Sequence, residues 1–205
     1  MADNDFAEFK SALIVGAGAG LSAALARVLT RAGLKVTLAS RTIDDLTALQ
    51  RETGAQAFAC DATKEAEVVN LFASLERNGG APDVVVYNAS GRSRGPFIDL
   101  VPADVEKAIA VSAFGGFLVA QQAARRMLRK GRGVIVFTGA SASVKGYAQS
   151  APFAMGKFAL RGLAQSMARE LAPQGIHVAH VVIDGGIKSA ARQDPPATSW
   201  SAGSP

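Results

Sequence analysis

The chain has 205 residues, of which 49% are hydrophobic and 19% are charged, and its formal net charge is +5. This length and apolar content predict one globular domain with a sizeable core and argue against a disordered chain. We expect no nucleic-acid partner, because the densest basic run, residues 125–132, falls at a predicted helix end where cations complement the helix dipole. The positive charge fits an anionic ligand better.

Neither an export signal nor a membrane segment is expected. Residues 1–10 carry acids where a signal peptide needs a basic start and an apolar core. No run of about eighteen apolar residues occurs, so no membrane partner is expected. Cys60 is the single cysteine, which excludes an internal disulfide and fits a reducing compartment. Together these features predict a cytoplasmic protein.

Short apolar runs alternate along the chain with stretches in which apolar residues recur at helical spacing. The predicted elements, in chain order, are strand 12–15, helix 21–29, strand 35–39, helix 43–52, strand 56–59, helix 64–78, strand 83–87, helix 102–130, strand 134–137, helix 152–172 and strand 176–183. Such alternation predicts βαβ units, a parallel sheet and right-handed crossovers that place helices on both faces. We therefore expect an α/β fold with a doubly wound parallel sheet, a Rossmann fold of three α/β/α layers.

The end of the chain departs from this pattern. No seventh strand is apparent, although a full doubly wound domain of this type normally has one. Residues 191–205 show little periodicity and contain a Pro-Pro pair, which is typical of disorder. We expect a single dinucleotide-binding domain over residues 1–190 that lacks the last strand, followed by a disordered tail over 191–205. A truncated, a frameshifted and a naturally short chain would all give this pattern.

A glycine-rich loop, GAGAGLS at residues 16–22, follows the first predicted strand and opens the first helix. Absent side chains let the backbone approach a pyrophosphate, and a helix N-terminus supplies N–H donors and a positive dipole end. We expect Gly16, Gly18, Gly20 and Leu21 to hold the diphosphate of a dinucleotide. The alternative is a glycine turn that binds nothing.

The residues that end the second strand discriminate between nicotinamide cofactors. An acid at this place binds the ribose 2′-hydroxyl of NAD, whereas an arginine pairs with the 2′-phosphate of NADP. The chain has Ser40 and Arg41 here, so NADP is favoured over NAD. The alternative is an arginine that faces solvent. The missing acid also argues against an S-adenosylmethionine methyltransferase.

Four further segments, in the expected order over residues 10–190, resemble those of the short-chain dehydrogenase/reductase family. An aspartate follows the third strand, an Asn-Ala-Ser-Gly segment follows the fourth, and an aromatic residue stands four places before a lysine. A glycine-containing loop, residues 184–189, follows the sixth strand. The resemblance implies cofactor contacts from Asp61, Ala62, Asn88, Ala89, Lys157, Gly185, Ile187 and Ser189, and an activity on a small-molecule carbonyl or alcohol.

The family's central acid is a tyrosine whose pKa is lowered by the lysine four residues later. Phe153 stands in that place before Lys157, so the phenol is missing. The resemblance leaves Lys157 to hold the nicotinamide ribose. Tyr147 precedes Phe153 by six residues, an offset that disfavours it as a substitute.

The other catalytic places also differ from the family pattern. The family's carbonyl-polarising serine stands thirteen residues before the tyrosine, which is Ala140 here, with Ser141 adjacent and Ser143 near. We expect Ser141 to take this role after a small loop adjustment. Ser112 occupies the place of an asparagine that holds a water.

Two functions follow from these motifs. The first is an NADP(H)-dependent oxidoreductase of the short-chain type, in which a water or another group replaces the phenol. The second is a dinucleotide-binding protein with little or no redox activity, a sensor or a partner subunit. No metal is expected, since His177 and His180 are separated by an odd number and point to opposite faces of a strand. The resemblance implies a homodimer through helices 102–130 and 152–172.

Overall fold

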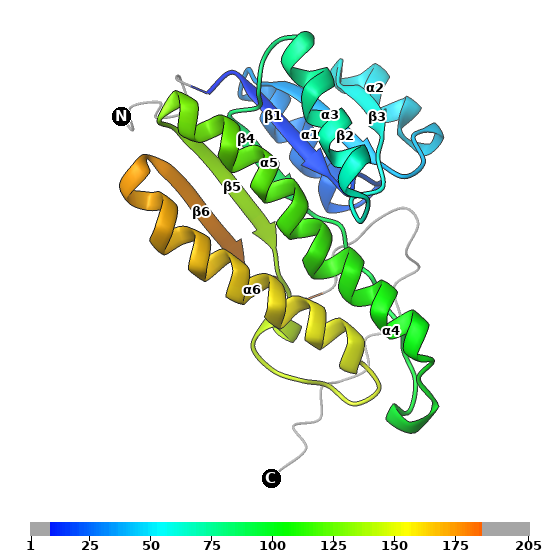
Figure 1. Cartoon of the computed structure of the whole chain (residues 1–205). Coiled ribbons are helices and arrows are strands. Elements are labelled where there is room, and N and C mark those ends of the chain that lie inside the picture. The colour runs from blue at the N-terminus through cyan, green and yellow to red at the C-terminus, as the bar shows by residue number, and fades with distance from the viewer. Residues whose placement is uncertain (1–8, 186–205) are drawn as a thin grey trace.

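The computed structural model describes residues 9–185, which form one six-stranded parallel sheet flanked by helices (Figure 1). The order across the sheet is β3-β2-β1-β4-β5-β6, so the chain winds outward from β1 in both directions. This confirms the predicted doubly wound Rossmann fold. The strands are β1 Ser11–Val15, β2 Lys35–Ser40, β3 Gln56–Ala59, β4 Val84–Tyr87, β5 Gly133–Thr138 and β6 Ile176–Val181.

The helices form the two outer layers. Helices α3, α5 and α6 cover one face of the sheet, and α1 and α2 cover the other (Figure 1). Helix α4 lies beyond the carboxyl ends of the strands and leads into α5 (Figure 1). Their bounds are α1 Leu21–Arg31, α2 Thr47–Thr53, α3 Glu65–Arg77, α4 Pro102–Ile109, α5 Gly115–Lys130 and α6 Ala151–Leu171. None of the described helices is long and apolar enough to cross a membrane.

Most predicted boundaries agree with the structure to within two residues, and three elements need correction. The sixth strand ends at Val181 and not at residue 183. The predicted helix 43–52 is a 3-10 turn, Asp44–Leu46, followed by α2. The predicted helix 102–130 is interrupted between α4 and α5 by a π-helical turn, Ala110–Phe114. The end of the domain at residue 190 and the tail 191–205 lie outside the described residues.

The π-helical turn makes two tertiary contacts. The Tyr87 hydroxyl, at the end of β4, donates a hydrogen bond to the Val111 carbonyl oxygen. The Ser112 hydroxyl accepts a hydrogen bond from the Gly91 N–H at 3.0 Å. Both contacts come from the strand end and loop that border the site, and π-helical turns frequently occur at functional sites.

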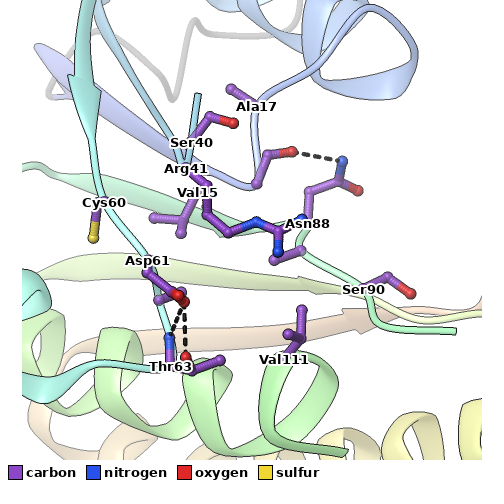
Figure 2. Close-up of a pocket in the computed structure, with 13 residues that line it drawn as sticks. Val15, Ala17, Ser40, Arg41, Cys60, Asp61, Thr63, Asn88, Ser90 and Val111 are labelled. Atoms are coloured by element: carbon purple, nitrogen blue, oxygen red, sulfur yellow. Dashed lines mark hydrogen bonds between the residues drawn. The ribbon is translucent and has the colours of Figure 1, made fainter. Parts of the chain in front are cut away.

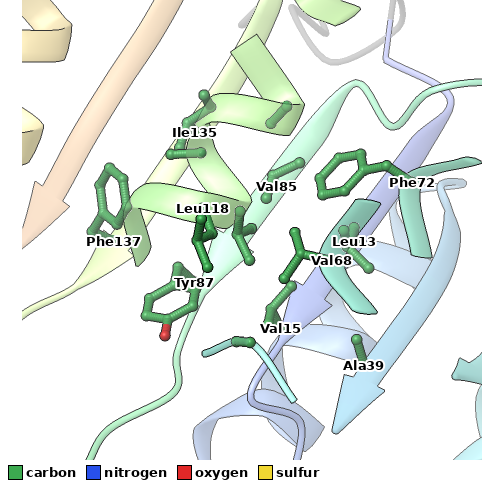
Figure 3. Packing of buried hydrophobic residues seen from close by; sticks show 14 of the residues in the cluster. Leu13, Val15, Ala39, Val68, Phe72, Val85, Tyr87, Leu118, Ile135 and Phe137 are labelled. Carbon is green, nitrogen blue, oxygen red and sulfur yellow. The ribbon is translucent and has the colours of Figure 1, made fainter. Parts of the chain in front are cut away.

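A hydrophobic core lies on each side of the sheet. The larger core packs Phe72 of α3 and Leu118 of α5 against the inner strands (Figure 3). Within it the rings of Tyr87 and Phe137 meet edge to face, with centroids 6.4 Å apart. Because β1 and β4 are covered on both faces, their residues are apolar without alternation, as is usual for parallel sheets. The central strands therefore form a rigid support for the loops at their carboxyl ends.

Asp83 stabilises the amino-terminal ends of the central strands, at the other end of the sheet from these loops. Its side chain is almost fully buried and accepts hydrogen bonds from the Lys10 and Ser11 backbone N–H groups at 2.9 and 3.2 Å. It also accepts one from Lys130 Nζ at 3.0 Å, which ties the end of α5 to β1. Burial opposes the charge, but these hydrogen bonds and the Lys130 ammonium hold the pKa of Asp83 below its usual range.

Asp83→Asn should therefore lower the free energy of unfolding by about 2 kcal/mol at neutral pH, since a charged acceptor of several hydrogen bonds is lost. The pKa of Asp83 is depressed in the folded state, so its contribution is present above the ordinary aspartate pKa and is lost as pH falls through the folded-state value. Urea unfolding between pH 7 and 3 tests this. The exposed Asp99→Asn is the control, and identical pH dependence in wild type and Asp83→Asn would contradict the assignment.

Candidate functional site

The glycine-rich loop connects the carboxyl ends of β1, β2 and β4. Gly16 and Ala17 donate backbone hydrogen bonds of 2.9 and 3.0 Å to the Ala39 carbonyl of β2. Gly16 has a φ of +82°, and a Cβ at this place would lie 2.3 Å from the Ala89 nitrogen. Only glycine fits both constraints. The loop is thus pressed against the segment that follows β4, at the point where the strand order reverses.

Ser22 and Asn88 fasten this close approach. Asn88 Nδ2 donates to Ser22 Oγ at 2.7 Å, and Ser22 Oγ donates to the Gly16 carbonyl at 3.0 Å (Figure 2 shows the Asn88 side chain turned toward this loop). Ser22 is buried and stands where the family pattern has its third glycine. Its hydroxyl satisfies polar groups that a glycine would leave to solvent or to a ligand. Ser22 was not predicted as a site residue. Its position in the glycine-rich motif could have identified it.

The loop leaves space for a ligand where the motif requires it. A Cβ at Gly18 would meet nothing within 4 Å, so the backbone there faces an open surface. Helix α1 begins at Leu21 after Gly20, has no side-chain cap and carries no acid in its first turn. Its first N–H groups lack intrahelical partners and its dipole favours an anion. The predicted residues Gly16, Gly18, Gly20 and Leu21 therefore form a surface that fits a pyrophosphate.

A cavity of about 300 Å³ opens beside this loop at the carboxyl ends of β1 to β4 (Figure 2). It brings together seven of the predicted cofactor residues from four different strand ends. The Arg41 side chain extends into it, and Cys60 lies on its wall. The residues that line it are Val15, Gly16, Ala17, Ser40, Arg41, Cys60, Asp61, Ala62, Thr63, Asn88, Ala89, Ser90 and Val111.

Asp61 is held in a fixed orientation within this cavity. Its Oδ1 accepts hydrogen bonds from Thr63 N and Thr63 Oγ1 at 3.0 and 2.8 Å. Partial burial opposes ionisation, but these hydrogen bonds and the charges of Lys64 and Arg41 keep the pKa of Asp61 below its usual range. Its neighbour Cys60 is the opposite case, because burial raises the pKa of that thiol to about 11. The carboxylate is charged and the thiol is inert at neutral pH.

A second cavity, of about 280 Å³, continues from Asn88 and Ser90 toward α6. It contains Phe153 and Lys157, the pair that the sequence places on one helix face. Ala140 lines it, while Ser141 does not. The full lining consists of Leu21, Asn88, Ser90, Arg92, Thr138, Gly139, Ala140, Phe153, Lys157, Ile183 and Gly185.

Lys157 is the buried cation of this cavity. Only 3% of the residue is exposed, and Nζ donates a hydrogen bond of 2.7 Å to the Thr138 carbonyl at the end of β5. Burial, and after it the positive charge of Arg92, lowers the pKa of Lys157 to about 8. An ammonium with this pKa exchanges its proton near neutral pH.

Neither Ser141 nor Ser143 lines this cavity. The Ser141 backbone N–H donates to the Ile183 carbonyl at 3.0 Å. Ser143 is fully buried, and its Oγ accepts from the Ala140 N–H at 3.1 Å and lies 3.4 Å from His180 Nε2. The Ser143 hydroxyl therefore stabilises the turn Ser141–Ser143 that follows Ala140.

Ser112 and Tyr147, the other two candidates, also lie apart from the second cavity. Ser112 is fully buried and its hydroxyl contacts the Gly91 backbone, so it holds the loop after β4. Tyr147 is not among the lining residues, and its ring meets Lys145 Nζ at 5.3 Å.

Arg92 lines the second cavity but was not predicted as a site residue. Its guanidinium carbon lies 4.1 Å from the centroid of the Phe153 ring, and it lines the second cavity. The only sequence signal was a pair of arginines in the loop 91–96, which is more typical of exposed loops. Ile187 and Ser189, which were predicted to contact the nicotinamide end, lie outside the described residues.

Two glycine substitutions should separate the structural from the ligand-binding role of the loop. Gly16→Ala should lower the free energy of unfolding by about 2 kcal/mol or more, because the new Cβ meets backbone and the residue has a positive φ. Gly18→Ala should leave it unchanged within about 0.5 kcal/mol, since nothing lies nearby. Chemical denaturation of both variants tests this, and equal losses would show that the close approach to Ala89 is not required.

Comparison with known proteins agrees with this geometry. Residues 10–199 match the family model of the short chain dehydrogenases. The chain is 30% identical to a synthase from Melia azedarach, (21S)-21-acetoxyl-apo-melianone synthase, over 83% of this chain and 65% of the synthase. It is also 30% identical to sorbitol-6-phosphate 2-dehydrogenase of Escherichia coli, over 87% and 71%.

A solved structure extends the likeness to three dimensions. Gluconate 5-dehydrogenase from Burkholderia cenocepacia, in complex with NADP and tartrate, has a TM-score of 0.80 and 30% identity. The match covers 85% of this chain and 71% of that one. The chain thus spans about two thirds of the Melia synthase and somewhat more of the other two relatives. The glycine loop, the strand order and these matches together show that the chain belongs to the short-chain dehydrogenase/reductase family.

Proposed function

We propose that the protein is an NADP(H)-dependent oxidoreductase that acts on a small carbonyl or alcohol. The single observation that carries this proposal is the first cavity, where Arg41 extends beside the glycine loop and Asp61. An acid that would bind the ribose 2′-hydroxyl of NAD is absent from the end of β2, and an arginine that can pair with a 2′-phosphate is present. The NADP complex of the Burkholderia relative supports the same preference by analogy.

The described residues that line the two cavities support this proposal. Gly16, Gly18 and the N-terminus of α1 would bind the pyrophosphate, Asp61 and Ala62 the adenine end, and Lys157 the nicotinamide ribose. The cofactor, when bound, supplies the hydride or accepts it. The chain's own residues orient the ligand along the two adjoining cavities, which share Asn88 and Ser90.

Proton transfer is the weak step of this site. Ala140 and Phe153 occupy the places of the family's two catalytic hydroxyl groups and carry no exchangeable proton. We propose that a water held in the second cavity takes the place of the phenol. Ser141 follows Ala140 directly and supplies a hydroxyl to the substrate only if the turn Ser141–Ser143 shifts.

The absence of hydroxyl groups at Ala140 and Phe153 also favours a second function. Without either hydroxyl, the cavity binds a nicotinamide ring and ribose but has no positioned acid, which typically costs about 10²–10⁴ in rate. A protein of this kind would bind the dinucleotide and turn over slowly, as a sensor or partner subunit. We favour the enzyme, because the cofactor motifs and the buried Lys157 are both retained.

We also propose a homodimer through the helices α4, α5 and α6. Their outer surface exposes large apolar side chains, including Phe117 at 40% and Phe158 at 45%, and the Phe114 and Phe117 rings stack. An apolar cavity of about 570 Å³ lies between α4 and α6, lined by Val105, Ile109 and Met155 among others. An apolar surface of this kind is typical of an interface between subunits.

Arg41→Gln should weaken NADPH binding by about 10–100-fold, since a charge-assisted hydrogen bond contributes about 1.5–3 kcal/mol. NADH binding should stay unchanged, because NADH has no 2′-phosphate. Calorimetric titration of both cofactors measures this, with Arg51→Gln on the exposed face of α2 as the control. Parallel losses for the two cofactors, or no loss, would remove Arg41 from the proposed site.

Phe153→Tyr should raise the rate of carbonyl reduction at saturating NADPH by about 10²-fold, because a phenol four residues before Lys157 restores a positioned acid. The control is Phe158→Tyr, one turn further on α6 and largely exposed. NADPH consumption is followed by absorbance with a panel of aldehydes, ketones and oxo acids. No gain over the control would favour the binding-only function.

Phe117→Asp should convert a dimer into monomers, because it places a charge in the centre of the proposed apolar interface. Sedimentation velocity at micromolar concentration measures the change, and we expect at least a tenfold weaker association. Val28→Asp changes an exposed valine on α1, on the other side of the sheet, and should have no effect. A wild-type protein that sediments as a monomer would overturn the dimer proposal.

A further inference from the structure

A histidine of β6 lies behind the wall of the second cavity. His180 pairs in register with Phe137 of β5, and its imidazole packs against Gly139. A Cβ at Gly139 would lie 2.2 Å from His180 Cε1 and 2.5 Å from Nε2, so the ring occupies the space that the glycine leaves. Gly139 and Ala140 line the cavity, whereas His180 does not. The imidazole therefore supports the wall of the cavity without facing into it.

Ser143 connects this imidazole to the backbone of the wall. Its hydroxyl oxygen accepts a hydrogen bond of 3.1 Å from the Ala140 N–H and lies 3.4 Å from His180 Nε2. Ser143 is fully buried, and a buried hydroxyl also needs an acceptor for its own proton. The acceptor that the described residues offer it is His180 Nε2. The hydroxyl thus donates to a neutral imidazole that carries its proton on Nδ1.

The surroundings of His180 keep its imidazole neutral. Lys157 and Arg161 of α6 are the cations that act on it, and β5 and the turn 138–144 carry no ionisable side chain. On β6 itself, His177 is exposed and three residues away, so it points to the opposite face of the strand. Burial first, and then the two cations, lower the pKa of His180 below its ordinary value. The acceptor for the buried hydroxyl is therefore present at neutral pH.

Protonation of His180 would remove this acceptor. An imidazolium donates at both nitrogens, so the buried proton of Ser143 would lose its partner at Nε2, and an unpartnered buried donor is costly. The imidazolium would also be a third cation beside Lys157 and Arg161. Both effects oppose the arrangement in which Ser143 Oγ holds the Ala140 N–H. The wall therefore keeps this arrangement while His180 is neutral and loses it when His180 is protonated.

We propose that His180 is a positioning residue of the second cavity and makes that cavity sensitive to pH. It acts through Ser143 on Ala140, the place at which the family pattern has its carbonyl-polarising serine. Above the ordinary histidine pKa the turn Ser141–Ser143 is held, and it is released as pH falls through the lower folded-state value. The nicotinamide half of a cofactor would therefore bind less tightly in acid. This last step rests on the proposed dinucleotide function.

Titration of the two histidines by NMR tests the hydrogen bond. The Cε1 proton of His180 should titrate below the ordinary histidine pKa of about 6.5. Ser143→Ala should raise that pKa, because the neutral imidazole loses the donor that stabilises it. His177, which is exposed on the same strand, is the internal reference and should not respond to Ser143→Ala. An unchanged or lower pKa of His180 in this variant would overturn the hydrogen bond.

Hydrogen exchange at the Ala140 amide tests the positioning role. Its protection, corrected for the intrinsic pH dependence of exchange, should fall at least about fivefold between pH 7 and 5 in the wild type. His180→Gln supplies an acceptor that does not titrate and should keep equal protection at both pH values. His177→Gln is the matched control and should behave as the wild type does. A fall of equal size in His180→Gln, or none in the wild type, would contradict the proposal.

Two ligands extend the test to the cofactor. NADP⁺ would occupy both cavities, whereas 2′,5′-ADP lacks the nicotinamide half. By calorimetry, the ratio of their affinities should fall at least about fivefold between pH 7 and 5 in the wild type and stay constant in His180→Gln. Lys157, with a pKa of about 8, keeps its charge over this range. A constant ratio in the wild type would overturn the pH-sensitive cavity. If neither ligand binds, the dinucleotide function fails, and the titration and exchange results still decide the role of His180.

Discussion

The close approach of Gly16 to Ala89 is the constraint on which the site depends. It joins the loop after β1 to the segment after β4, the two strands between which the winding of the chain reverses. The Ser22–Asn88 hydrogen bond secures the contact, and Asn88 also lines both cavities. The dinucleotide surface and the second cavity are therefore positioned by the same few atoms. The buried, two-sided core behind them supplies the rigidity that such a contact requires.

Asn88 lies between two parts of the site that carry different chemical groups. On the β1–β3 side, the described residues carry what a phosphorylated dinucleotide needs, namely an open glycine backbone, a helix N-terminus and a cation at the end of β2. On the α6 side, Phe153 and Ala140 remove two hydroxyl groups, and Arg92 lies over the ring instead. The glycine loop is thus retained while the residues at the two hydroxyl positions differ from the family pattern. The site therefore contains a buried lysine of lowered pKa, Lys157, but no phenol that could act as a positioned acid.

Much of this arrangement was predictable from the sequence because it follows from periodicity and from strand ends. The alternation of apolar runs predicted the parallel sheet, and residues that end successive parallel strands, such as Arg41 and Asp61, necessarily meet at one edge. The π-helical turn at Ala110–Phe114 was not predictable, since it is contacted by the Tyr87 hydroxyl from a distant strand. Likewise Arg92 lies in an irregular loop, where no periodicity relates it to Phe153. The Asp83 contacts join β1, β4 and α5 and have no local signature.

We infer that the cofactor-binding half of the site is intact in a chain that lacks the family's acid. Calorimetric titration of the unmodified protein with NADPH, and with NADH in parallel, tests it most directly because binding does not require turnover. We expect saturable one-to-one binding of NADPH and clearly weaker binding of NADH. Absence of binding by either cofactor would contradict it, and the glycine loop and Arg41 would then belong to a scaffold that no longer holds a dinucleotide.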